Sequence, residues 1–116
     1  MTQAIQQWLT RNANAAGVLA FTVQFPDKST LTQKCVAEIS SEALENSWRC
    51  VLETIPVLRL NRFPMGRFRW VYQSAIVHCE SRRDGICLGI FTQKDPNLFR
   101  PEELDRLVSE FHALGA

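Results

Sequence analysis

The chain has 116 residues, of which 46% are hydrophobic and 22% are charged, and its formal net charge at pH 7 is +1. This length and composition predict one globular domain, residues 1–116, and exclude a disordered chain. The near-neutral charge disfavours nucleic acid as a partner, because nucleic-acid-binding domains usually carry a pronounced basic excess.

The sequence predicts neither a membrane segment nor a metal or cofactor site. The amino end, MTQAIQQWLT, lacks the basic and apolar regions of a signal peptide, and no run of about 18 apolar residues occurs. We therefore expect a cytoplasmic protein without a membrane span. The cysteines lack C-x-x-C spacing, so we expect reduced, buried thiols at Cys35, Cys50, Cys79 and Cys87.

The first third of the chain predicts a helix followed by a hairpin. Residues 2–14 have the apolar spacing of a short amphipathic helix. Residues 18–25 are rich in β-branched and aromatic side chains, and residues 30–37 alternate in polarity, so both segments are expected to be strands. The sequence PDKS between them favours a turn.

A second helix is predicted to begin after Ser40 or Ser41, whose hydroxyl can accept a hydrogen bond from an unpaired backbone amide. Its apolar side chains recur at helical spacing and form one stripe. They are Leu44, Trp48, Val51, Leu52 and Ile55. Because proline lacks the amide donor and disfavours helix at the preceding residue, Pro56 is expected to end or kink the helix near residues 54–55.

Three strands and a last helix are predicted in the second half. The strands are residues 66–73, 74–81 and 86–93, and the RRDG sequence before the third strand is a strong hairpin signal because glycine tolerates a positive φ. Pro101 and the acids after it are expected to open the last helix.

The strand at residues 66–73 alternates between two kinds of side chain. The two faces are expected to carry Phe68, Trp70 and Tyr72 on one side and Arg67, Arg69 and Val71 on the other. The wider segment 56–74 contains four arginines and no acid. Two interpretations of this segment are open. Its aromatic side chains pack in the core while its arginines are solvated, or it forms a sheet edge that another chain covers.

The order helix, two strands, helix, three strands, helix resembles the roadblock/LC7 family. The closest local likenesses are GVLAFTVQFPDKSTLTQ, similar to the family's first hairpin, and IVHCESRRDGICLGIFTQKDPN, similar to its later hairpin and apolar strand. The resemblance implies an α/β fold of the α+β type, α-β-β-α-β-β-β-α. It further implies a five-stranded antiparallel sheet in the order 2-1-5-4-3, with helices on both faces: the middle helix on one and the terminal helices on the other.

No catalytic motif occurs in the sequence. The patterns G-x-x-x-x-G-K-[ST], G-x-G-x-x-G, G-x-S-x-G and H-E-x-x-H are all absent. His78 and Cys79 are neighbours, but adjacent side chains in a strand point to opposite faces of the sheet. We therefore expect no catalytic residues and no enzyme activity.

The resemblance implies a dimerising scaffold that regulates a small Ras-like GTPase or another NTPase, with the middle helix and the third strand forming the homodimer. The residues expected at this interface are Leu44, Trp48, Val51, Arg67, Phe68, Arg69, Trp70 and Tyr72. One alternative is a profilin-like sensor or small-ligand-binding module of the PAS, GAF or longin type. Another is single-stranded nucleic-acid binding by the arginines between Arg59 and Arg69.

Overall fold

A computed structural model describes residues 2–62 and 67–114 of the chain. It contains three helices and five strands in the predicted order. They are α1 (Thr2–Arg11), β1 (Val18–Gln24), β2 (Thr30–Lys34), α2 (Ser41–Leu60), β3 (Arg67–Val71), β4 (Ile76–Ser81), β5 (Cys87–Thr92) and α3 (Pro101–Ala113).

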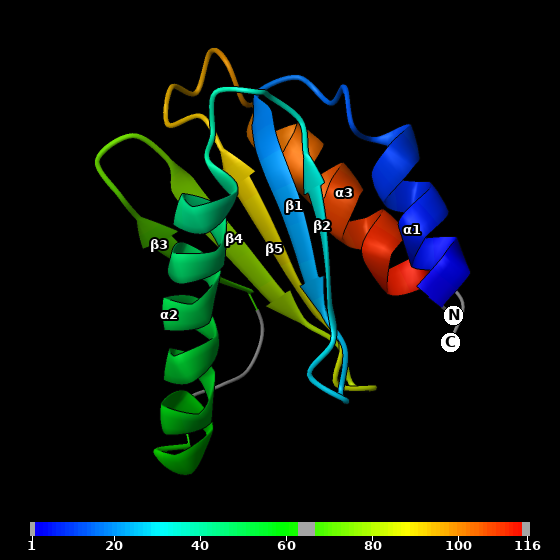
Figure 1. The fold of residues 1–116 in the computed structure, drawn as a ribbon, viewed down its shortest axis with the longest axis vertical. Coiled ribbons are helices and arrows are strands. Elements are labelled where there is room, and N and C mark those ends of the chain that lie inside the picture. Colours follow the sequence, from blue (N-terminus) through cyan, green and yellow to red (C-terminus); the bar gives the residue numbers. More distant parts are fainter. Residues whose placement is uncertain (1, 63–66, 115–116) are drawn as a thin grey trace.

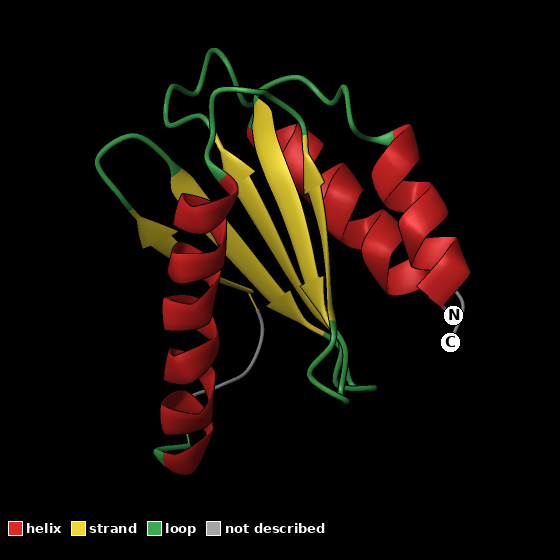
Figure 2. Cartoon of the chain, in the orientation of Figure 1, coloured by secondary structure: helices red, strands yellow, loops and turns green. Residues whose placement is uncertain are grey.

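The strands form one antiparallel sheet in the order β2-β1-β5-β4-β3, which confirms the predicted topology. Helix α2 lies on one face of the sheet, and α1 and α3 lie on the other (Figure 1, Figure 2). β5 lies in the middle and is buried along its whole length, as its nearly continuous apolar sequence predicts. β2 and β3 are the two edges.

The hydrophobic core has two parts, one on each side of the sheet. On the side of α1 and α3, the largest buried side chains are Trp8, Phe21 and Phe111. The register between β1 and β5 shifts between Val18 and Ala20. As a result Val18 and Phe21 both face α1 and α3, whereas Ala20 joins the core beneath α2.

Of the two predicted effects of Pro56, an end of the second helix near residues 54–55 is wrong, because α2 continues through Pro56 to Leu60, and a kink there stays a prediction. A proline inside a helix removes one backbone hydrogen bond and costs about 3 kcal/mol, but it does not prevent the following turns from forming. Ile55, just before the proline, is 5% exposed and is anchored in the core beneath α2. The last turns of α2 then project beyond the end of the sheet (Figure 1).

The turns agree with their sequence-based predictions more closely than the ends of the helices and strands do. In the Asp84-Gly85 turn, Gly85 has a φ of +89°, and the Asp84 carboxylate accepts a hydrogen bond of 3.2 Å from the Ile86 amide. Several strands are shorter than predicted: β2 ends at Lys34 and β3 at Val71. Residue 66, the predicted start of the third strand, lies outside the described residues. No helix in the described ranges is long and apolar enough to cross a membrane.

Candidate interaction surface

The apolar stripe of α2 faces the protein's own sheet. Leu44, Trp48 and Val51 are only 2%, 4% and 0% exposed. They pack against side chains of β1, β4 and β5 in the core beneath α2, among them Val77 and Phe91. These three predicted interface residues therefore hold α2 on the sheet, and any partner meets the other sides of the helix.

Trp48 lies on β5 at a position that only glycine can occupy without rearrangement. A Cβ atom added at Gly89 would lie 2.5 Å from Cζ3 of Trp48 and 3.0 Å from Cγ2 of Thr22. Carbon atoms in normal van der Waals contact are about 3.5–4.0 Å apart. The Trp48 indole thus packs directly against the backbone of β5, in the space that a side chain at position 89 would otherwise fill.

A groove of about 260 Å³ runs beside this tryptophan, between α2 and strands β1 and β2, with Thr22 and Leu44 on its walls. The indole Nε1–H of Trp48 is buried and has no hydrogen-bond acceptor among the described residues. Beside this groove the α2–sheet interface is closed by the buried side chains of the core beneath α2.

Strand β3 alternates as predicted between the two faces of the sheet. Phe68 and Trp70 are half-buried on the α2 side, where their ring centroids lie 6.4 Å apart and Trp70 packs against the core beneath α2. Arg67 and Arg69 are exposed. Arginines and aromatics therefore separate onto opposite faces.

Tyr72 follows β3 in the turn toward β4, where its backbone N–H donates to the Ala75 carbonyl at 2.8 Å. The side chain is 37% exposed. Burial, and to a lesser extent Cys50, raise the pKa of the Tyr72 phenol. The end of β3, where Tyr72 lies, is therefore near the side of α2 that carries Cys50.

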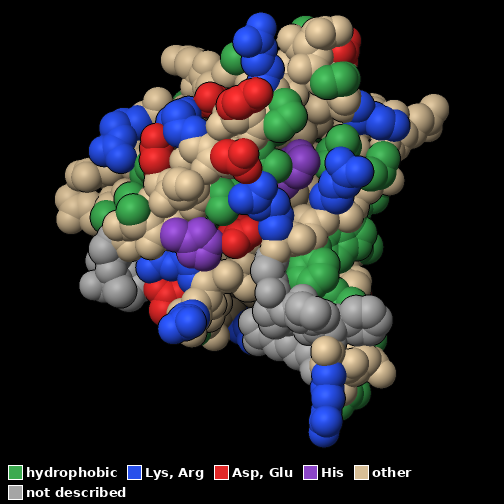
Figure 3. All heavy atoms as spheres, turned by 180° about the vertical axis from the view of Figure 1, so that it is seen from behind, with side chains coloured by type: hydrophobic (Ala, Val, Ile, Leu, Met, Phe, Trp, Pro, Cys, Tyr) green, Lys and Arg blue, Asp and Glu red, His purple; other side chains and the backbone are tan. Residues whose placement is uncertain are grey.

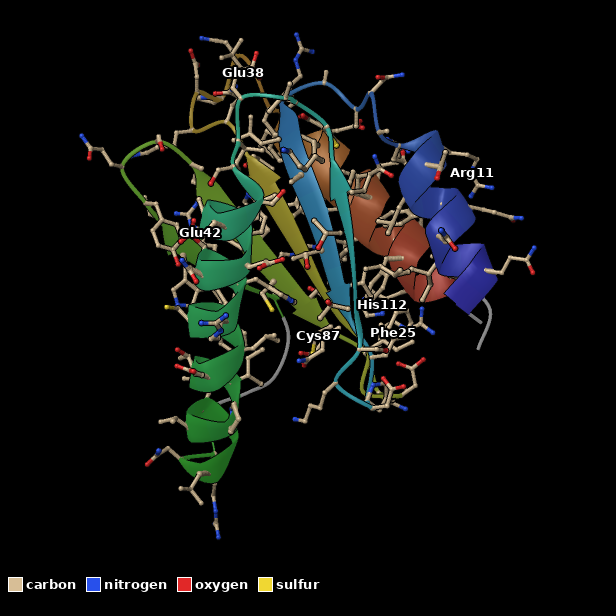
Figure 4. The ribbon with its side chains drawn as sticks, viewed as in Figure 1. Arg11, Phe25, Glu38, Glu42, Cys87 and His112 are labelled. Atoms are coloured by element: carbon tan, nitrogen blue, oxygen red, sulfur yellow. The ribbon has the colours of Figure 1, made fainter. Side chains whose placement is uncertain are left out.

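Exposed apolar side chains occur on both α2 and β3. Val57 and Leu60 of α2 are 55% and 82% exposed, and Val71 of β3 is 58% exposed. β3 pairs only with β4 among the described strands, so its outer backbone edge has no partner strand. We call the edge of β3, with Tyr72 and the outer side of α2 at Cys50 and Val57, the α2–β3 surface. Val71 stands at the end of this edge, and its side chain lies on the face opposite α2, beside Ile76. Figure 4 shows the side chains along α2, with Glu42 near its first turn.

The local basic excess of segment 56–74 is partly neutralised. Arg67 donates to the Asp105 carboxylate of α3 at 3.0 Å and lies 3.7 Å from Glu80 of β4. The prediction that these arginines lie outward or against acids is confirmed for Arg67. Arg62 is exposed in the turn after α2, and the side chain of Arg59 lies outside the described set.

The cysteines are all free, but they differ in exposure. Cys79 and Cys87 are buried, Cys35 is half-buried and Cys50 is exposed. The expectation of burial is therefore wrong for Cys50, which sits on the outer side of α2, away from the sheet. Burial, Cys87 and Glu80 raise the pKa of the Cys79 thiol to about 12, and burial raises that of Cys35 to about 11. Neither thiol is therefore a nucleophile at neutral pH.

His78 and Cys79 point to opposite faces of the sheet, as predicted. Cys79 belongs to the core beneath α2, whereas His78 packs beside Phe99 on the side of α3. In residues 2–62 and 67–114, no group of three or more His, Cys, Asp or Glu side chains is placed to hold a metal ion. No family model matches the chain, and no curated protein sequence matches it significantly. The likeness to roadblock/LC7 proteins therefore stays a prediction.

Proposed function

We propose that the chain is a cytoplasmic, non-catalytic module that forms a homodimer through the α2–β3 surface and, as a dimer, scaffolds or regulates an NTPase such as a small Ras-like GTPase. The observation that carries the proposal is the open edge of β3 beside exposed apolar side chains. The NTPase partner comes from the resemblance to roadblock/LC7 proteins.

An open strand edge invites a second strand, because its backbone N–H and C=O groups are already aligned for pairing. Proteins normally protect such an edge with charge, proline or a covering segment. The side chains of Arg67 and Arg69 stand above one face of β3, while Val71 at its end is 58% exposed. A second copy related by a twofold axis would cover the same groups on both chains at once.

The exposed side of α2 extends this surface. Cys50 and Val57 are seven residues apart and so lie on one side of the helix. Tyr72 lies near Cys50, which places the end of β3 beside that side. Val57 on α2 and Tyr72 at the end of β3 are exposed side chains that a second copy could cover.

The test is the oligomeric state of matched variants in analytical ultracentrifugation. Val71→Asp places a charge at the open edge, and Leu98→Asp places the same charge on a side chain of similar exposure, 53% against 58%, outside the α2–β3 surface. We expect dimers for the wild type and Leu98→Asp and monomers for Val71→Asp. A monomeric wild type at micromolar concentration, or a dimeric Val71→Asp, contradicts the proposal.

The partner is tested separately by affinity capture from the native cell. The wild type should retain a nucleotide-binding protein, and Val71→Asp should retain less of it if the partner binds the dimer. Capture of no nucleotide-binding protein by a dimeric wild type would remove the NTPase part and leave the dimer standing.

A further inference from the structure

A small hollow lies on the face of the sheet opposite α2, where β3, β4 and β5 meet the beginning of α3. Its volume is about 200 Å³, and its polar lining includes Arg69, His78 and Lys94. The lining contains no acidic side chain. Figure 3 shows this face of the molecule, where basic, acidic, histidine and hydrophobic side chains lie next to one another.

The sheet register brings the first two of these groups together. Arg69 of β3 is paired directly with His78 of β4, so their side chains stand side by side on the same face. His78 is 8% exposed, and its Nε2 lies 3.1 Å from Oγ1 of Thr92 on β5. No protein partner of the other ring nitrogen occurs among the described residues, although the ring borders the hollow.

The positive charge in the hollow has no counterion in the described ranges. Arg67 is engaged by Asp105 and Glu80, but no described carboxylate lies within ion-pair distance of Arg69. Lys94 donates only to the Gln73 carbonyl, at 3.4 Å. Burial lowers the pKa of His78 to about 4, and the positive charges of Arg69 and Arg67 add to this effect.

The other walls are apolar and include Ile76, Phe99 and Leu104. A volume of about 200 Å³ has room for about six water molecules at about 30 Å³ each, and it is smaller than most drug-sized sites. The occupant must therefore be small. Apolar walls favour an organic body over a bare inorganic ion, and guanidinium matches the planar geometry of a carboxylate.

The geometry points to a binding site for a small carboxylate with an apolar body, its charged end between Arg69 and Lys94 and its body against Phe99 and Leu104. This function goes beyond dimerisation and does not depend on it. Val71 is paired with Ile76, which lines the hollow, so benzoate binding is measured on the wild-type chain and not on Val71→Asp.

Benzoate is a suitable probe, and benzamide is its uncharged control of nearly the same shape. In two-dimensional NMR titrations of the full chain, benzoate should shift the signals of residues around the hollow with a Kd of about 1 mM, as expected for so small a ligand. Benzamide and inorganic phosphate should each bind at least about tenfold more weakly. Equal binding of benzoate and benzamide, or tighter binding of phosphate, would overturn the proposal.

The matched variants are Arg69→Met, which removes a lining charge, and Arg83→Met, which removes an exposed arginine outside the hollow. Benzoate affinity should fall about tenfold in the first and stay unchanged in the second. Lys94→Met provides a second lining variant if Arg69→Met does not give the spectrum of a folded chain. Unchanged affinity in a folded lining variant, or no benzoate shift in the wild type, refutes the site.

The imidazole of His78 provides an independent readout. The charged groups around it are Arg69 and Arg67 from β3, Lys94 after β5, Glu80 on its own strand and Asp105 on α3. A bound carboxylate offsets the repulsion from the arginines, so saturation with benzoate should raise the pKa of His78 in NMR titration. An unchanged pKa at saturation would place the benzoate elsewhere and contradict the proposal.

Discussion

Replacing Gly89 by alanine tests whether Trp48 is a core residue of the single chain. The added Cβ would lie 2.5 Å from Cζ3 and 2.8 Å from Cε3 of the indole. To restore a normal carbon contact of about 3.5 Å, the ring must withdraw by about 1 Å. Trp48 is 4% exposed and has little room to withdraw, so the substitution overpacks the core beneath α2.

Overpacking of this kind costs about 1–3 kcal/mol. Alanine is better than glycine inside a strand by about 0.5–1 kcal/mol, which offsets part of that cost. We therefore expect Gly89→Ala to lower the free energy of unfolding by about 1–2 kcal/mol. Urea unfolding at one fixed protein concentration measures this difference, since dimerisation would make stability depend on concentration.

The control is the same substitution in a Trp48→Leu background. Leucine leaves space above β5, so Gly89→Ala should there be neutral or stabilising by about 0.5 kcal/mol. The difference between the two backgrounds is the coupling between the two positions. If Gly89→Ala stabilises the wild type, or costs the same in both backgrounds, then Trp48 does not rest on Gly89 and the packing described for α2 is wrong.

Three further predictions concern α2, β4 and the thiols. Pro56→Ala restores an amide donor inside α2 and should raise the free energy of unfolding by about 1–2 kcal/mol in urea, less if the freer unfolded chain offsets the gain. The pKa of His78 is lowered from 6.5 to about 4 in the folded chain. The unfolded chain therefore binds the extra proton first, and stability should fall as pH decreases from about 6.5 to about 4. His78→Gln should flatten this slope in urea titrations at several pH values. In native Val71→Asp, the expected monomer, iodoacetamide should modify Cys50 well before Cys79, whereas dimerisation of the wild type should slow the modification of Cys50, as mass spectrometry would show.

The number and order of the elements could be predicted because each segment has a distinct period and is separated by turn residues. The Asp84-Gly85 turn is set by local backbone chemistry and was equally predictable. The end of α2 was not, because the rule for proline describes a local cost, whereas Ile55 and the residues before it anchor the helix through contacts with the distant sheet.

The functional surface was harder to predict for a related reason. An apolar stripe such as Leu44, Trp48 and Val51 shows that a helix face is covered, but it does not say by what. In the structure their own sheet covers them. The hollow beside His78 combines residues from 69 to 104, and only the sheet register brings Arg69 next to that histidine. The one feature of the sequence that pointed to a basic site here was the acid-free segment 56–74, which contains Arg69.

The position of β5 in the sheet has a consequence for folding during synthesis. In the sheet order β2-β1-β5-β4-β3, the strand that joins the two halves is the last one to be synthesised. Until Thr92 has left the ribosome, the β1–β2 and β3–β4 hairpins have no strand between them, and both present open edges. Pairing Val18 with Thr92 then closes a long loop late, which slows folding. A chain that stalls before residue 87 would hold two separate hairpins and no shared core, which makes it a substrate for chaperones or for aggregation.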